Sequence, residues 1–261
     1  QRLLIKDAEI LCVTFSPDGR TLAVGSEDGT IRLLDIFSGE VLRVLEEHTS
    51  SVTSVVFSPD GKQLASAGPD SVRLWDAVSG ELLRVLEWDR PTDGPGSIAF
   101  SPDGYSLAAA GYGKAHLWNT RNGKIQHLLG GQDHFITGID FSPDGRVLAS
   151  GGLDGLLRLW NPESGEELGV LKGHTGVPSG VAVAFSPDGK MLASWSSLNG
   201  TVRICDMSKA EEKQMLEGFS LPDVSLTFSP DGSMLASGDH LGYVHLWDVG
   251  TGEHLDRKSV V

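Results

Sequence analysis

The sequence predicts an all-β protein built from six similar four-stranded units, and two observations lead to this fold class. The first is a pentapeptide, Phe-Ser-Pro-Asp-Gly, that recurs at intervals of 41 to 44 residues, a period typical of repeat architectures. Its copies begin at Phe15, Phe57, Phe100, Phe141, Phe185 and Phe228. The second is the composition, because 33 Gly and 12 Pro among 261 residues suit many short strands joined by tight turns. Six evenly spaced hairpins predict a circular all-β array.

Each pentapeptide has the local chemistry of a hairpin turn. Proline presets φ for the first corner position of a type I turn, aspartate can hydrogen-bond its own backbone, and glycine takes the left-handed conformation that closes the turn. The phenylalanine before the turn ends a strand, and we expect its side chain to face inward, beginning with Phe15.

The rest of each repeat supplies three more strands in a fixed order. After the turn, a second strand contains Leu-Ala-Ser, for example at residues 64–66 and 148–150. A third strand ends in tryptophan followed by Asp or Asn, as at residues 72–76, and a glycine-containing turn leads to an apolar stretch such as 82–86. Such runs, separated by Gly, Asp and Pro, indicate four strands per repeat. The repeats cover roughly residues 1–40, 41–80, 81–123, 124–165, 166–208 and 209–252 of one domain spanning 1–261.

This pattern resembles the WD-repeat β-propeller family over essentially the whole chain. The dipeptide that names the family stands at Trp75-Asp76 and Trp247-Asp248, and Asn replaces its Asp at residues 118–119 and 160–161. The resemblance implies a six-bladed β-propeller of four-stranded antiparallel blades. A fragment of a seven-bladed propeller is the alternative. The nearly uniform sequence of the repeats resembles bacterial members of the family more than eukaryotic ones.

The chain ends are expected to share a blade. Residues 2–5 (Arg-Leu-Leu-Ile) resemble the outermost strand of a blade, whereas residues 254–258 (His-Leu-Asp-Arg-Lys) form a poor strand pattern. We therefore expect residues 1–5 to close the last blade by pairing with the third strand around residues 244–247, which would remove two open sheet edges.

By resemblance, some blades carry a hydrogen-bonded set made of a loop His, a second-strand Ser, a turn Asp and the third-strand Trp. The complete sets are His48, Ser66, Asp70 and Trp75, and His134, Ser150, Asp154 and Trp160. A buried His, Ser and Asp are tolerated only when they satisfy one another's hydrogen bonds. We therefore interpret these residues as structural rather than as a catalytic triad.

Composition excludes several classes of partner and compartment. The net charge of −14 argues against nucleic-acid binding, which needs a basic surface. No run approaches the roughly 18 apolar residues of a membrane helix, so no membrane insertion is expected. Cys12 and Cys205 fall in different repeats, which favours a reducing, cytoplasmic compartment over a disulfide framework.

The motifs of catalysis are missing from the sequence. It contains no Gly-x-Ser-x-Gly, no phosphate-binding loop and no His-Glu-x-x-His, and the cysteines lack the spacing of a zinc site. His116 and His245 stand where other repeats place Arg, so a repeated structural role is favoured over metal ligation. The inner strands offer one acid, Asp140. We therefore expect no enzyme activity, no cofactor and no metal, and a propeller enzyme with a central-channel site is the less favoured alternative.

Binding of a protein or peptide is the expected function. Family members commonly bind partners on the face with the loops before the first strand and between the second and third strands, and apolar residues there would mark an interaction site. The predicted partner-binding residues are Leu11, Trp88, Arg90, Tyr112, Phe135, Leu153, Leu198 and His240. The chain would then be a scaffold, as a subunit or sensing module of a larger assembly. A structural subunit held by its disc edge is the alternative.

Overall fold

The computed structural model describes residues 9–88, 95–171, 174, 180–196, 201–209, 211–216, 225–238 and 243–259, without the side chains of 131–133, 211–212, 243 and 256–259. Within these ranges the regular structure is β-strand throughout, which confirms the predicted all-β class. None of these residues forms a helix long and apolar enough to cross a membrane. The chain divides into two compact units, residues 1–111 with 115–128 and residues 112–114 with 129–261.

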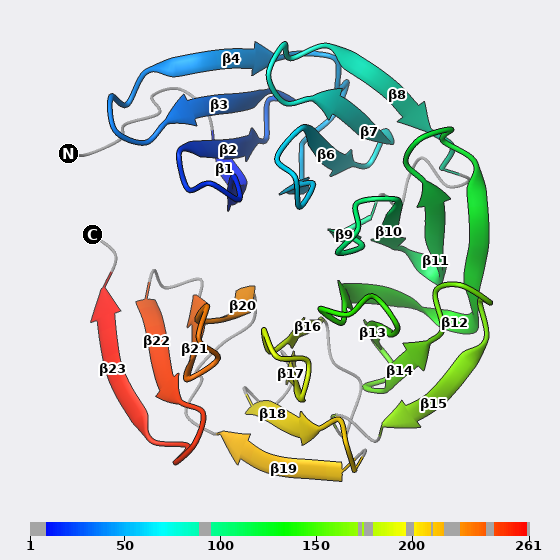
Figure 1. The fold of residues 1–261 in the computed structure, drawn as a ribbon, viewed down its shortest axis with the longest axis vertical. Coiled ribbons are helices and arrows are strands. Elements are labelled where there is room, and N and C mark those ends of the chain that lie inside the picture. Colours follow the sequence, from blue (N-terminus) through cyan, green and yellow to red (C-terminus); the bar gives the residue numbers. More distant parts are fainter. Residues whose placement is uncertain are drawn as a thin grey trace. The chain divides into compact units, whose positions relative to one another are not determined.

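The first unit consists of antiparallel sheets whose strands follow one another in chain order; each group of four strands is here called a blade, and the third group is part of a seven-stranded sheet (Figure 1). The first blade contains β1 (Ile10–Phe15), β2 (Thr21–Ser26), β3 (Ile31–Asp35) and β4 (Val41–Leu45). The second contains β5 (Ser54–Phe57), β6 (Gln63–Gly68), β7 (Ser71–Asp76) and β8 (Leu82–Leu86). The third contains β9 (Ser97–Phe100), β10 (Ser106–Ala110), most of β11 (Tyr112–Asn119) and the start of β12 (Ile125–Phe141).

The second unit repeats the same strand order. The rest of β12 joins β13 (Leu148–Gly152), β14 (Leu157–Trp160) and β15 (Glu167–Leu171) in the fourth blade. The fifth blade contains β16 (Val181–Phe185), β17 (Met191–Ser196), β18 (Thr201–Asp206) and β19 (Glu211–Leu216). The sixth contains β20 (Ser225–Phe228), β21 (Met234–Gly238), β22 (Tyr243–Asp248) and β23 (His254–Ser259).

The pentapeptide forms the predicted turn in every repeat. In the first, the hydroxyl of Ser16 donates to Asp18 over 2.6 Å and accepts from the backbone N–H of Thr21 over 2.9 Å. Gly19 has φ +69°, the left-handed conformation that glycine adopts without steric cost. The Ser16 hydroxyl and the Arg20 backbone N–H lower the pKa of Asp18, so the turn is held by an ionised carboxylate.

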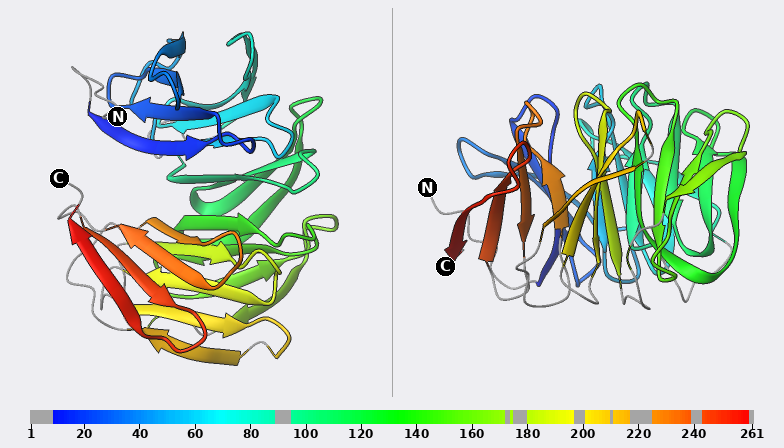
Figure 2. Two further views of the ribbon diagram at one scale, coloured as in Figure 1. Left: turned by 60° about the vertical axis from the view of Figure 1, so that its left-hand side comes forward. Right: turned by 90° about the horizontal axis from the view of Figure 1, so that it is seen from below.

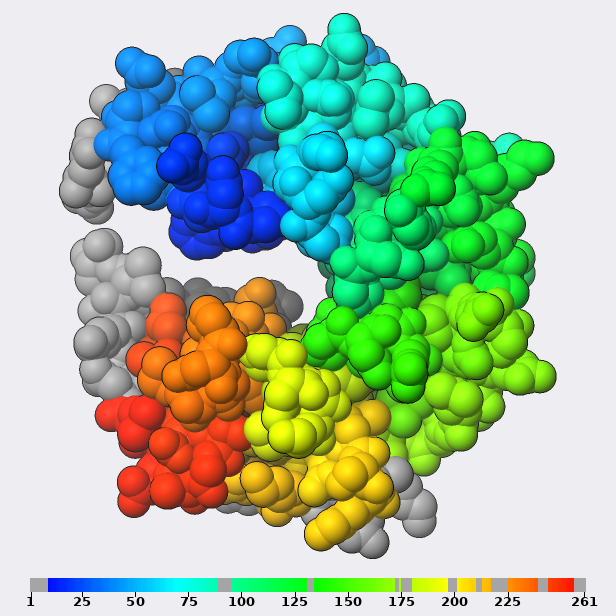
Figure 3. All heavy atoms as spheres, viewed as in Figure 1, coloured from blue at the N-terminus to red at the C-terminus, as the bar shows by residue number. Residues whose placement is uncertain are grey.

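Consecutive turns within each unit are in contact, because the proline of one turn lies at van der Waals distance from the glycine of the next (Figure 3). A side-chain carbon at Gly61 would lie 3.5 Å from Cδ of Pro17, and one at Gly104 would lie 3.7 Å from Cδ of Pro59. The same contact joins Gly189 to Pro143, at 3.4 Å, in the second unit.

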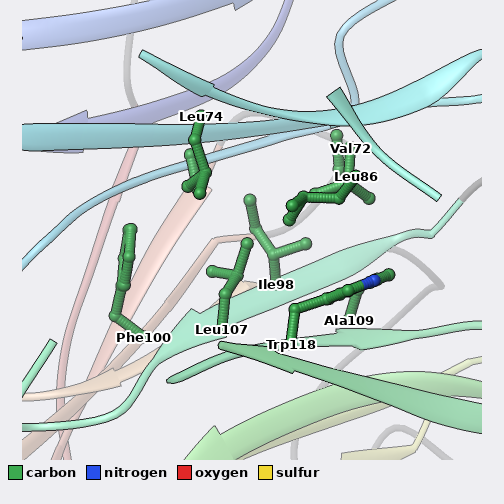
Figure 4. Close-up of a cluster of buried hydrophobic side chains, with 10 residues drawn as sticks. Val72, Leu74, Leu86, Ile98, Phe100, Leu107, Ala109 and Trp118 are labelled. Carbon is green, nitrogen blue, oxygen red and sulfur yellow. The ribbon is translucent and has the colours of Figure 1, made fainter. Parts of the chain in front are cut away.

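The core lies between neighbouring blades. Phe100 and Trp118 of the third blade pack on Val72, Leu74 and Leu86 of the second (Figure 4). In the same way Phe57 packs on the first blade and is 7% exposed. The prediction for Phe15 is wrong, because its side chain is 62% exposed. Phe57 and Phe100 are buried against the blade that precedes them in the chain, and Phe15 has no such contact among the described residues.

The sixth blade corrects the prediction about closure. Its outer strand is β23, which pairs with β22 from Tyr243↔Ser259 to Trp247↔His254 (Figure 2). The outer edge of β22, predicted to pair with residues 2–5, is therefore occupied by residues that the sequence analysis considered a poor strand. Residues 1–5 themselves lie outside the described residues.

One strand, β12, takes the place of a connecting loop. It runs for 17 residues, and its residues 136–141 pair with β13 as the inner strand of the fourth blade. A side-chain carbon at Gly130 would clash with the carbonyl oxygen of Gly113 and approach Cα of Lys114 to 2.9 Å. Glycine at position 130 thus allows β12 to lie directly against the start of β11, and this hairpin brings Tyr112 onto the loop side of the fourth blade.

Candidate functional site

The first predicted set, in the second blade, forms a continuous hydrogen-bonded chain. His48 Nδ1 lies 2.8 Å from Asp70 Oδ1 and His48 Nε2 lies 2.7 Å from the Ser66 hydroxyl, which also accepts the indole N–H of Trp75 over 2.8 Å. Burial lowers the pKa of His48, so the ring is neutral and its Nδ1–H donates to the carboxylate. Asp70 Oδ2 accepts the backbone N–H of Thr49 over 3.1 Å and pairs with Arg73 at 3.3 Å, so the polar side-chain atoms of the set all have partners within the protein.

The second predicted set forms only in part. Trp160 donates its indole N–H to Ser150 over 2.9 Å, as expected. His134, however, is exposed, and no hydrogen bond joins it to Ser150 or Asp154 among the described residues. Asp154 pairs instead with Arg158 at 2.7 Å. His134 belongs to β12 here, and the extended backbone holds it away from the buried serine.

Trp88, which was predicted to bind a partner, packs against the third blade. Its ring lies 4.5 Å from that of His116 and 6.1 Å from that of Trp118, and it is half-buried against the core between the second and third blades. Ala109 stands here at the position of the serine. The indole N–H groups of Trp88 and Trp118 are buried without a hydrogen-bond partner among the described residues.

The histidines at the arginine position have a structural role. His116 stacks on Trp118 with ring centroids 5.3 Å apart, and His245 stacks on Trp247 at 5.5 Å. His245 Nδ1 also lies 3.2 Å from Nε2 of His254. Within the described ranges, no three His, Cys, Asp or Glu side chains come together in a way that could hold a metal ion.

Asp140, the acid of the inner strands, bonds the backbone of the next blade. Its Oδ2 accepts the N–H of Phe185 over 2.8 Å, and burial raises the pKa of this carboxyl to about 6. The neighbouring Thr137 hydroxyl bonds both the N–H and the C=O of Val181, at 2.8 and 2.9 Å. These side chains fasten the fourth blade to the fifth.

Three of the predicted partner-binding residues come together in the second unit. Tyr112 is 37% exposed, and its ring meets that of Phe135 edge to face, with centroids 4.9 Å apart. Leu153 is half-buried, and its N–H donates to the carbonyl of Phe135 over 2.8 Å. Edge-to-face pairing fixes the two rings relative to each other, so the surface is preorganised. We call Tyr112, Phe135 and Leu153 the loop-face cluster.

The first blade shows that this backbone arrangement does not require apolar side chains. There the N–H of Glu27 donates to the carbonyl of Glu9 over 2.9 Å, at the positions equivalent to Leu153 and Phe135. Both glutamates are exposed. The same pair of positions is thus charged in one blade and apolar in another, and the backbone does not dictate the difference.

The other predicted partner-binding residues are not brought to this cluster. Leu11 is exposed on β1 of the first unit. Arg90, Leu198 and His240 lie outside the described residues. Lys114, which was not predicted as a partner-binding residue, is exposed on β11 two residues beyond Tyr112. The eight-residue length of β11, longer than the third strand of other blades, is the feature that places it there.

The sequence matches the family described as WD domain, G-beta repeat six times, over residues 5–35, 39–76, 80–119, 123–161, 165–206 and 211–248. It is 30% identical over 212 residues to periodic tryptophan protein 2 of Arabidopsis thaliana and 28% identical over 208 residues to Protein HIR1 of Kluyveromyces lactis. These alignments cover 80% and 73% of this chain but only 23% and 21% of the relatives. An uncharacterized WD repeat-containing protein of Synechocystis sp. is 30% identical over 70% of this chain and 40% of its own length.

Proposed function

Because this chain belongs to the WD-repeat family of β-propeller proteins, we propose that it is a non-catalytic scaffold that binds a protein or peptide through the loop face of its blades. The observation that carries the proposal is the loop-face cluster. Exposed apolar side chains gathered on a surface usually mark an interaction site, and aromatic residues commonly anchor such sites. Tyr112 is an exposed aromatic residue, Phe135 is half-buried, and their edge-to-face contact holds the two rings in one geometry.

The hydrogen bonds of the titratable residues support a role without catalysis. His48, Ser66 and Asp70 satisfy one another, and Asp140 is engaged by the backbone N–H of Phe185. A protein or peptide partner also fits the net charge of −14 better than a nucleic acid does. We further propose that the chain is a subunit or sensing module of a larger assembly in the cytoplasm, a compartment in which the free thiols of Cys12 and Cys205 would stay reduced.

A second candidate is a structural subunit held by the outer strands of its blades. The observation in its favour is that outer strands also expose apolar side chains, namely Leu42 and Val44 on β4 and Leu83 and Val85 on β8. These side chains alternate along the strands, so each strand presents one apolar face to its surroundings.

One pull-down from native extract, read by mass spectrometry, separates the two candidates. It compares the unchanged chain with the variant Tyr112→Asp, Phe135→Asp and with the matched control Leu42→Asp, Val44→Asp, which adds the same charge to an outer strand. Thermal melting verifies that each variant is folded. The scaffold proposal expects specific partners to disappear with the first variant and to remain with the second. The reverse pattern would assign binding to the outer strands.

A further inference from the structure

The loop-face cluster adjoins an exposed cation that no described residue neutralises. Along β11, Tyr112 and Lys114 are exposed while Gly113 and Ala115 are buried, so the two exposed side chains project from the same face of the strand. Among the described residues, no carboxylate forms an ion pair with Lys114. Lys114 therefore provides a positive charge beside the aromatic pair, two residues along β11 from Tyr112.

Asp154, an acid of the fourth blade next to Leu153, is already engaged. Asp154 accepts hydrogen bonds from Arg158 over 2.7 Å and from the backbone N–H of Leu156 over 3.1 Å, and these groups hold its pKa below the usual range. Its charge is thus compensated by a guanidinium on its own blade. His134, exposed next to Phe135, adds a ring that can donate one hydrogen bond.

We propose that the loop-face cluster takes an extended segment of a partner protein with an apolar side chain against Tyr112 and Phe135 and a carboxylate two residues along, paired with Lys114. This inference rests on the proposed function and specifies the chemistry of its partner. An extended segment rises about 3.3 Å per residue, so its residues i and i+2 have the spacing of Tyr112 and Lys114 on β11. The complementary charges fix the direction and register in which the segment lies.

The test begins with a displayed library of random ten-residue peptides, selected on the 261-residue chain. Each enriched peptide is then synthesised with a fluorescent label, together with a twin in which its acid is replaced by lysine. Fluorescence anisotropy measures the affinity of both peptides for the unchanged chain, for Lys114→Glu and for Tyr112→Ala. The control variant is Lys124→Glu, which makes the same charge change at the other end of β11, in the turn that leads to β12.

The expected result is a library that converges on an apolar residue with Asp or Glu two positions away. Tyr112→Ala weakens the acidic peptide at least about tenfold, as loss of an aromatic anchor does. Lys114→Glu lowers the affinity for the acidic peptide about three- to fivefold, the range of an exposed ion pair. This variant binds the lysine twin more tightly than the acidic peptide. Lys124→Glu changes neither affinity, and added salt reduces the preference between the twins.

Three results would overturn the inference. The library could enrich basic or uncharged peptides, or the acidic peptide and its lysine twin could bind equally well both to the unchanged chain and to Lys114→Glu. The third is that no selected peptide binds the unchanged chain and Lys114→Glu with different affinity. The proposed function has a separate criterion. If Tyr112→Asp, Phe135→Asp abolishes peptide binding while Lys114→Glu does not alter it, the loop face binds but the acidic segment is wrong. If the selected peptides bind that double variant as well as the unchanged chain, the loop-face assignment fails too.

Discussion

The indole N–H of Trp75 donates to the hydroxyl of Ser66 over 2.8 Å. The same hydroxyl bonds Nε2 of the buried His48, so Ser66 links the third strand of the second blade to this histidine. The third blade lacks this link. Trp118 stands at the position of Trp75, but Ala109 replaces the serine, and its tryptophan N–H is buried without a partner among the described residues. The two blades therefore have the same backbone arrangement and differ in whether the buried tryptophan N–H has a hydrogen-bond partner.

Ala109→Ser should stabilise the protein by about 1 kcal/mol, the usual net contribution of a hydrogen bond. The new hydroxyl would occupy the register position of Ser66 and accept the N–H of Trp118. Urea unfolding measures the change. Ala108→Ser is the matched control, because Ala108 is equally buried on the same strand but its side chain projects from the opposite face. A stability loss at Ala109 as large as that at Ala108 would contradict this reading of the third blade.

Ser66→Ala should cost more stability than Ser150→Ala. Removal of the Ser66 hydroxyl leaves both the Trp75 N–H and His48 Nε2 without a partner, and each buried unsatisfied group costs about 1–3 kcal/mol. At Ser150 only the Trp160 N–H loses its acceptor. The difference in the free energy of unfolding between the two variants checks this. Equal losses would mean that His48 contributes nothing through its serine.

Asp140→Asn should stabilise the folded protein at neutral pH and not in acid. Burial raises the pKa of Asp140 from 3.8 to about 6, so the protonated form is favoured on folding. Stability from this group is complete below pH 3.8 and is lost as the pH rises through 6. Asparagine keeps an oxygen for the Phe185 N–H and does not ionise, so the gain at pH 7.5 should be on the order of 2 kcal/mol.

The measurement is the melting temperature of both proteins at pH 4 and pH 7.5. Asp144 offers a control of opposite sign, because the Ser142 hydroxyl and the Arg146 N–H lower its pKa. Its stabilising effect is present above pH 3.8 and lost as the pH falls further, so Asp144→Asn should destabilise at pH 7.5. An Asp140→Asn gain that is the same at both pH values would rule out ionisation as its cause.

Local chemistry explains what the sequence could predict. The turn follows from four adjacent residues, because Ser16, Asp18 and Gly19 bond one another and depend little on distant parts of the chain. The set around His48 was also predictable, since its members recur at fixed positions of the repeat. The loop-face cluster was predicted as separate residues on one face, and its ring contact became visible only with the structure.

The features that the sequence analysis missed depend on neighbours in space. Residues 130–133 (Gly-Gly-Gln-Asp) have the composition of a loop, yet they continue β12 because Gly130 permits close approach to β11. This strand also carries His134 away from Ser150. The outer strand β23 forms with few apolar residues, because its backbone pairs with β22. Phe15 has the same local sequence as the buried Phe57 and Phe100, so its exposure could not be predicted from that sequence.

The most direct test of the loop-face assignment is site-specific photo-crosslinking with benzoylphenylalanine at position 112, compared with position 105. Tyr105 is the matched control, because it is also an exposed tyrosine but directly follows the third pentapeptide, where Arg121 covers its ring at 3.8 Å. After irradiation in native extract, the account predicts a specific crosslinked protein from position 112 and none from position 105. Crosslinks from position 105 alone, or the same products from both positions, would contradict it.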